Sequence, residues 1–323
     1  RGDALKVENL AVRLLIEAPG ADTPWGTING AKCSILLSPP KSNQLSRAEM
    51  TLRAADAVTP WAATTNLNLT LQLFSTAQDT NIIHAELELA ADSAQSRSNR
   101  ADGIHFTAQW FHSLTNAIPL SGHGELQGTN VITDWGSANR FQLAATLLQS
   151  TNSPTVDTSW AWWTNFAQYP LKLELAANDI HAPKLAIQEI LCSGEWAAPN
   201  LTIEKLSAKL YGGKLAADAK LNVGTRQLGF NVTSDFDGQK IAPLLTPMAR
   251  EWLANYSWNN PPHIKAEGAM ILPASVWTNR HPDWRAELRP TLRLNGQFHV
   301  DDGAFRGVRA LTAESHFSYS NMC

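Results

Sequence analysis

The stretch that decides the fold is LTIEKLSAKLYGGKLAADAKLNVGTRQLGFNVT, residues 201–233. Apolar residues fall on every second position through most of it, as in the run from Leu215 to Val223. Such alternation predicts β-strands with one apolar and one polar face. Gly212–Gly213 and Gly224–Thr225–Arg226 interrupt the pattern over lengths that suit hairpins. The stretch therefore predicts three consecutive antiparallel strands.

The same alternation recurs along the rest of the chain, in about fifteen segments. The clearest are residues 31–37, 48–54, 67–73, 83–89, 104–110, 141–147, 171–177, 264–272 and 292–300. Few helical segments separate them, which argues against a parallel sheet, whose crossovers need helices. We therefore expect a mainly β protein built as a long antiparallel meander.

Two segments break the alternation. Trp160, Trp163 and Phe166 have helical spacing and predict a helix near 157–169, which Pro170 would end. A second helix is predicted near 238–256, with Asp237 as its cap and with Pro243 and Pro247 kinking or dividing it. Each helix is expected to cover an end of the sheet, and a lid or a partner-facing helix is the alternative.

Composition limits the classes of function. The 323 residues carry 26 Lys and Arg against 29 Asp and Glu, a net charge of −3, without a dense basic run, so no nucleic-acid partner is expected. No stretch of 18 consecutive apolar residues and no signal-type segment occurs, and both ends are expected to be truncated from a longer protein. We divide the chain into two β segments, 1–156 and 157–323. Cys33, Cys192 and Cys323 are too far apart for a metal knuckle and read as buried or incidental thiols.

No catalytic or metal motif is present, so neither an enzyme nor a cofactor is expected. The nine histidines lack zinc spacing, and no Gly-x-Ser-x-Gly elbow occurs. Asp301–Asp302–Gly303 predicts a turn rather than a calcium loop, because the later oxygen ligands are missing. The twelve tryptophans suit packing of loops and helix ends, with sugar stacking and membrane anchoring as alternatives.

Several short motifs carry a resemblance. LYGGKL at 210–215, GFNV at 229–232, the Asp-Phe-Asp step at 235–237 and Ile241 with Leu244–Leu245 resemble the C-terminal region of the AsmA-like family of bacterial envelope proteins. GAFRGV at 303–308 repeats the hairpin loosely. The resemblance covers residues 200–318 and extends to 1–199 only as a general pattern. The family's N-terminal membrane helix has no counterpart in this chain, and the Asn- and Trp-rich middle of this chain does not align with the family.

The resemblance implies a fold and a function. AsmA-like proteins resemble bridge-type lipid transfer proteins, in which a long antiparallel sheet curves into an elongated trough with an apolar inner face. Such proteins are anchored in the inner membrane, extend through the periplasm and support phospholipid transport to, and integrity of, the outer membrane. The implied partners are phospholipid acyl chains, the inner membrane through an anchor absent from this chain, and outer-membrane or envelope proteins.

The residues expected to face the lipid groove follow from the alternation. They are Leu67, Leu69, Leu71, Leu73, Leu206, Leu210, Leu215, Leu221, Leu228, Phe230, Val232, Leu292, Leu294 and Phe298. Three other interpretations stay open: a β-sandwich or β-solenoid module that binds carbohydrate, an outer-membrane barrel, and an envelope scaffold with the same trough and no lipid cargo.

Overall fold

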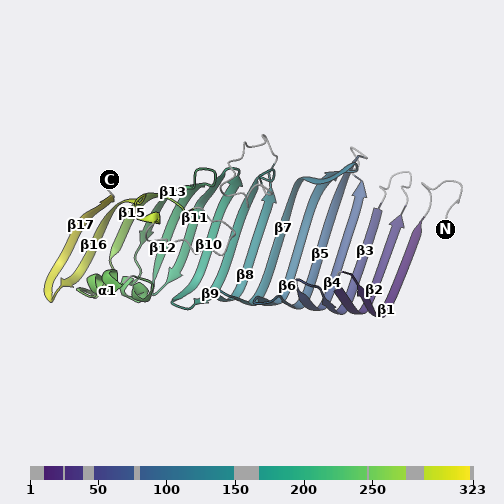
Figure 1. The fold of residues 1–323 in the computed structure, drawn as a ribbon, viewed down its shortest axis with the longest axis horizontal. Coiled ribbons are helices and arrows are strands. Elements are labelled where there is room, and N and C mark those ends of the chain that lie inside the picture. Colours follow the sequence, from purple (N-terminus) through teal and green to yellow (C-terminus); the bar gives the residue numbers. More distant parts are fainter. Residues whose placement is uncertain are drawn as a thin grey trace. The chain divides into compact units, whose positions relative to one another are not determined.

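A computed structural model describes residues 11–24, 26–38, 47–75, 81–148, 167–245, 247–273 and 287–320 (Figure 1). Its seventeen strands are antiparallel at every pairing and fall into two compact units, residues 1–149 and 150–323. The predicted division at 156–157 and residues 157–166 of the helix predicted near 157–169 lie outside the described residues, and residues 167–169 are not helical. The prediction of a mainly β, antiparallel fold is confirmed.

The first unit is a meander of eight strands, each of which pairs with the next. The strands are β1 (Val12–Thr23), β2 (Gly26–Ser38), β3 (Arg47–Val58), β4 (Ala63–Ser75), β5 (Ile82–Gln95), β6 (Arg100–Ser113), β7 (Asn116–Thr133) and β8 (Gly136–Leu147). Short connections, such as the Asp134–Trp135 turn between β7 and β8, leave no room for a crossover helix. Strands that are consecutive in the sequence therefore pair with one another in the sheet.

The second unit is a meander of nine described strands, interrupted by a helical segment (residues 238–244 and 247–253). Its strands are β9 (Leu171–Ala182), β10 (Leu185–Ala197), β11 (Asn200–Leu210), β12 (Gly213–Asn222), β13 (Gln227–Ser234), β14 (Tyr256–Trp258), β15 (His263–Ile271), β16 (Arg293–Phe305) and β17 (Val308–Ser320). β13 pairs with β15, and β14 pairs with the far end of β16. Because β15 pairs with the near end of β16, β14 and β15 lie end to end along the same side of that strand.

The hairpins predicted in the deciding stretch are confirmed. Tyr211 and Gly212 form the β11–β12 turn with φ values of 49° and 81°, and such paired positive values characterise the two-residue turns that match strand twist. Arg306 and Gly307 repeat this geometry between β16 and β17, with φ values of 48° and 82°. The turn predicted at Asp301–Gly303 is wrong, because these residues lie inside β16, where Asp302 (φ 51°) only interrupts the pairing.

The helical segment predicted near 238–256, kinked or divided at Pro243 and Pro247, is two short helices, the 3-10 helix η3 (Gly238–Leu244) and α1 (Pro247–Leu253). Asp237 caps η3 by accepting a hydrogen bond from the Gln239 backbone N–H, as predicted. Pro247 begins α1, which explains the division, since proline lacks the N–H that a continuous helix needs. The helical prediction was wrong at its end, because Tyr256 begins β14.

Neither unit has a conventional core. Apart from glycine and proline, only nine described residues are buried, and five of these are alanines. The chain exposes 21386 Å², against about 13,000 Å² expected for a compact monomer of its mass. The small cluster around Trp196 and Val223 packs one end of the second unit. Among the described residues, most apolar side chains are therefore covered only by their neighbours on the same sheet face.

Candidate functional site

The first unit carries rows of apolar side chains that cross all eight strands. One row is Ile16, Cys33, Leu52, Leu69, Leu89, Phe106, Leu126 and Leu143. The next row is Leu14, Ile35, Met50, Leu71, Leu87, Ala108, Gly124 and Ala145. A third is Val12, Leu37, Ala48, Leu73, Ala85, Trp110, Gly122 and Leu147. No charged residue interrupts the three rows, which at ~4.8 Å per strand span about 34 Å.

The second unit repeats this arrangement. One row is Leu173, Gly194, Ile203, Ala219, Phe230, Gly268, Leu294 and Tyr319. Another is Leu175, Cys192, Leu206, Ala217, Val232, Ala266, Gly296 and Phe317. We call each set of rows the apolar face of its unit. Alternation forces the residues between them, such as Lys220, Asn231 and Glu267, onto the opposite, polar face.

Local irregularities keep apolar residues on one face along the full strand length. Gly30, Asn66 and Gly103 have φ values of 60°, 51° and 55° and lie where strand pairing is interrupted. At such a point the alternation of the two faces shifts by one residue. Asn130, with φ 47°, is a further example: a Cβ on Gly128 would lie 3.7 Å from Cγ2 of Val131, so these two residues, three apart, lie on the same face. Residues at an odd separation therefore share a face, as expected at a β-bulge.

The predicted groove residues fall where the alternation places them, with one exception. Leu67, Leu69, Leu71 and Leu73 lie side by side on the apolar face of β4. Leu206, Leu210, Leu215, Leu221, Leu228, Phe230, Val232, Leu294 and Phe298 lie on the apolar face of β11, β12, β13 and β16. Leu292 precedes β16 and is not part of a strand.

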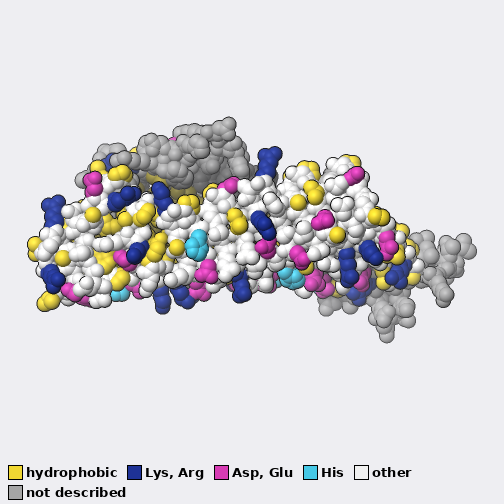
Figure 2. Space-filling view, turned by 90° about the horizontal axis from the view of Figure 1, so that it is seen from below, with side chains coloured by type: hydrophobic (Ala, Val, Ile, Leu, Met, Phe, Trp, Pro, Cys, Tyr) yellow, Lys and Arg dark blue, Asp and Glu magenta, His cyan; other side chains and the backbone are white. Residues whose placement is uncertain are grey.

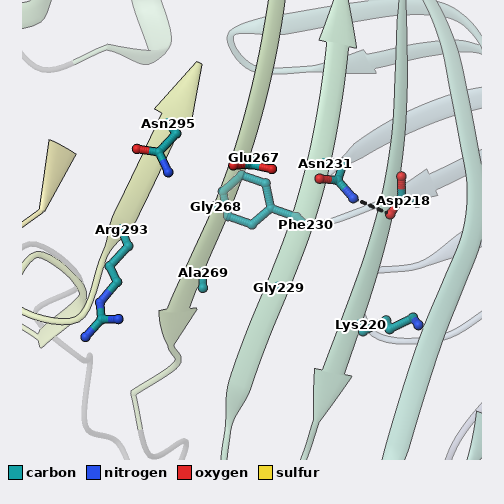
Figure 3. Close-up of a pocket in the computed structure, with 10 residues that line it drawn as sticks. All are labelled: Asp218, Lys220, Gly229, Phe230, Asn231, Glu267, Gly268, Ala269, Arg293 and Asn295. Carbon is teal, nitrogen blue, oxygen red and sulfur yellow. Dashed lines mark hydrogen bonds between the residues drawn. The ribbon is translucent and has the colours of Figure 1, made fainter. Parts of the chain in front are cut away.

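The polar face of the second unit is hollowed. A hollow of about 520 Å³ is lined by the charged side chains of Asp218, Lys220, Glu267 and Arg293 (Figure 3). Asn231 donates a hydrogen bond to the Asp218 carboxylate at 2.9 Å. Two further hollows adjoin it, and the three together are lined by two carboxylates and three basic side chains over β12, β13, β15, β16 and β17. The prediction that the apolar face is the inner one stays a prediction.

This charged surface was missed in the sequence. Its signal is a charge on every second residue of successive strands, as in Asp218 and Lys220 on β12 and Lys265 and Glu267 on β15. Gly268 and Gly296 lie on the apolar face, as the alternation over 264–272 and 292–300 predicts. Gly194 also belongs to this face, and only its pairing with Leu173 and Ile203 reveals it.

No group of three or more His, Cys, Asp or Glu among the described residues is arranged to hold a metal ion, and none of their helices is long and apolar enough to cross a membrane. Cys192 lies on the apolar face, and burial raises the pKa of its thiol. Hydrogen bonds from Gln127 and Gln142 lower the pKa of Glu125 on the polar face of β7.

The chain matches no family model, no curated protein and no solved structure. The AsmA-like resemblance therefore stays a prediction that depends on the hairpin motifs and the strand pattern alone.

Proposed function

We propose that this chain belongs to a non-enzymatic envelope protein that shields lipid acyl chains on its apolar sheet faces. In this role it supports phospholipid transport between the inner and outer membranes and the integrity of the outer membrane. Its place would be the periplasm, as part of a protein anchored to the inner membrane. The resemblance to the AsmA-like family supports this assignment, and the apolar faces support it on physical grounds.

The observation that carries the proposal is the unbroken width of the apolar rows. An apolar face in water is costly unless something covers it, and the described strands of each unit supply a single layer. An acyl chain of about sixteen carbons would gain on the order of 10 kcal/mol on burial, before entropy losses. Since successive rows carry similar side chains, no position is strongly preferred, and a bound chain can slide.

Native mass spectrometry of the chain, prepared from a bacterial envelope without detergent, tests the proposal. We expect co-purified phospholipid. Two matched pairs of variants locate it: Leu71→Lys on the apolar face against Thr70→Lys on the polar face of β4, and Val232→Asp against Thr233→Asp on β13. Each pair adds the same charge at adjacent positions of one strand.

Loss of phospholipid in the apolar-face variants alone, with circular dichroism unchanged, supports the proposal. Well-folded wild-type protein without lipid would reject it in favour of a scaffold or a carbohydrate-binding module. Equal lipid content in both members of each pair would place the lipid somewhere other than the apolar faces.

A further inference from the structure

The end of the apolar face formed by β14, β16 and α1 carries exposed apolar side chains that nothing in the described structure covers. Met248 and Trp252 of α1 are 73% and 60% exposed, and Phe305 and Val308 of the β16–β17 hairpin are 45% and 74% exposed. We call these four residues the rim. Figure 1 shows α1 next to the ends of the last strands, at the β16–β17 turn.

Ring contacts join the rim into one surface. The Trp252 and Tyr256 ring centroids are 4.7 Å apart, and those of Tyr256 and Phe305 are 4.9 Å apart. The Arg306 backbone N–H donates to the Asn255 carbonyl oxygen at 2.8 Å, and its Nε donates to Asn255 Oδ1 at 3.2 Å. The hairpin turn and the end of α1 are therefore held together rather than merely adjacent.

Charged side chains of both signs surround the rim. Arg250, Arg306 and Arg309 are exposed, and the Arg306 guanidinium carbon lies 5.4 Å from the centre of the Phe305 ring. Lys240 is exposed on η3. Among nearby carboxylates, Glu251 and Asp302 are exposed, Asp301 lies 3.3 Å from His299, and Asp237 caps η3. Figure 2 shows apolar and Lys or Arg side chains next to one another at the end of the molecule that carries the last strands.

We propose that the rim docks on the surface of a bilayer that contains anionic lipids. Tryptophan beside arginine suits the boundary between headgroups and acyl chains, and basic side chains are attracted to an anionic leaflet. A stable protein–protein interface buries about 800 Å² per partner, more than four side chains supply. The inference goes beyond the proposed function, since a bilayer can be bound whether or not acyl chains enter the apolar face.

Flotation with vesicles tests the docking. We expect the chain to float with vesicles of phosphatidylethanolamine and phosphatidylglycerol, less with phosphatidylcholine alone, and less at high salt. The Met248→Ser/Trp252→Ser variant should bind about tenfold more weakly, because two apolar side chains no longer enter the bilayer. Val308→Ser, on the hairpin, should weaken binding in the same direction and does not alter α1.

The matched control is Trp61→Ser/Trp135→Ser, which removes two tryptophans that are 73% and 85% exposed in turns of the first unit. This control should float like the wild type. Arg250→Gln/Arg309→Gln should lower both the binding and its dependence on salt. Absence of wild-type flotation, or equal flotation of the rim variant and the control, would overturn the proposal and favour a protein partner. Phospholipid content, measured on the same variants, reports separately on the apolar face.

Discussion

The ring of Phe230 on β13 lies across Gly268 on β15, its direct partner in the sheet. A Cβ at position 268 would lie 2.5 Å from Cζ of that ring. Phe317 lies across its partner Gly296 in the same way two strands further on. An aromatic ring over a cross-strand glycine covers backbone that would otherwise be bare, and it lies flat against the sheet. The Phe230 and Phe317 rings therefore project little from the apolar face of the second unit.

This relationship predicts a penalty for adding one methyl group. Gly268→Ala should lower the free energy of unfolding by about 1–2 kcal/mol, because the Phe230 ring must leave its place. In a Phe230→Leu background the same change should cost at least about 0.5 kcal/mol less, since residues in contact couple by this much or more. Chemical denaturation of the four proteins gives the coupling energy directly.

Gly229→Ala is the control for this cycle. Gly229 precedes Phe230 in β13 and faces the polar side of the sheet. A Cβ at position 229 would meet only the Gly268 carbonyl oxygen, at 4.0 Å. We expect it to be neutral or to stabilise by about 0.5 kcal/mol, because glycine is unfavourable within a strand. A loss as large as that of Gly268→Ala would show that glycine at this point of the sheet matters for a reason other than the ring.

The sequence predicted the strands well because alternation is a local property. The run from Leu67 to Leu73 reports its apolar face without reference to any other strand. The phase change near Asn66 and the place of Gly268 beneath Phe230 were not predictable, since both depend on which residues pair across strands. The charges of Asp218 and Glu267 also gather only once β12, β13 and β15 are aligned.

The cap of η3 predicts a local loss of order. Asp237 Oδ1 accepts hydrogen bonds from the Gln239 N–H and from the Trp258 indole N–H, both at 3.1 Å. Asp237→Ala removes both and should cost about 1–2 kcal/mol. Hydrogen exchange should then quicken across residues 238–245 while β12 and β13 keep their protection. Asp237→Asn retains the accepting oxygen and should behave like the wild type. Equal exchange in all three proteins would mean that the cap contributes nothing.

Glu125 predicts a small acid sensitivity of the first unit. Gln127 and Gln142 donate to the same carboxylate oxygen at 2.7 and 2.6 Å, and these bonds lower the pKa of Glu125. Because the folded pKa is the lower one, the stabilisation is present above the unfolded pKa of about 4.3 and is lost as pH falls through the folded value. The carboxylate is solvent-exposed, so the effect should be slight. Titration of the Glu125 carboxyl carbon by NMR should show its pKa rise in Gln142→Ala. An unchanged value would contradict this account.

Bound phospholipid should slow the chemical labelling of two cysteines, one on the apolar face of each unit. Cys33 pairs with Leu52 in the first unit, and Cys192 pairs with Leu175 and Leu206 in the second, so each thiol reports on one face. In a Cys323→Ser background, a water-soluble maleimide should label both slowly in protein that carries phospholipid and faster after lipid extraction.

Because burial raises the pKa of Cys192 and the thiolate is the reactive form, its labelling rate should still climb at pH values where the labelling rate of an ordinary thiol has levelled off. Cys33→Ser/Ser34→Cys moves the thiol to the polar face of β2, where lipid extraction should leave the rate unchanged. Equal rates at Cys33 and Cys192 before and after extraction would mean that no acyl chain covers either face.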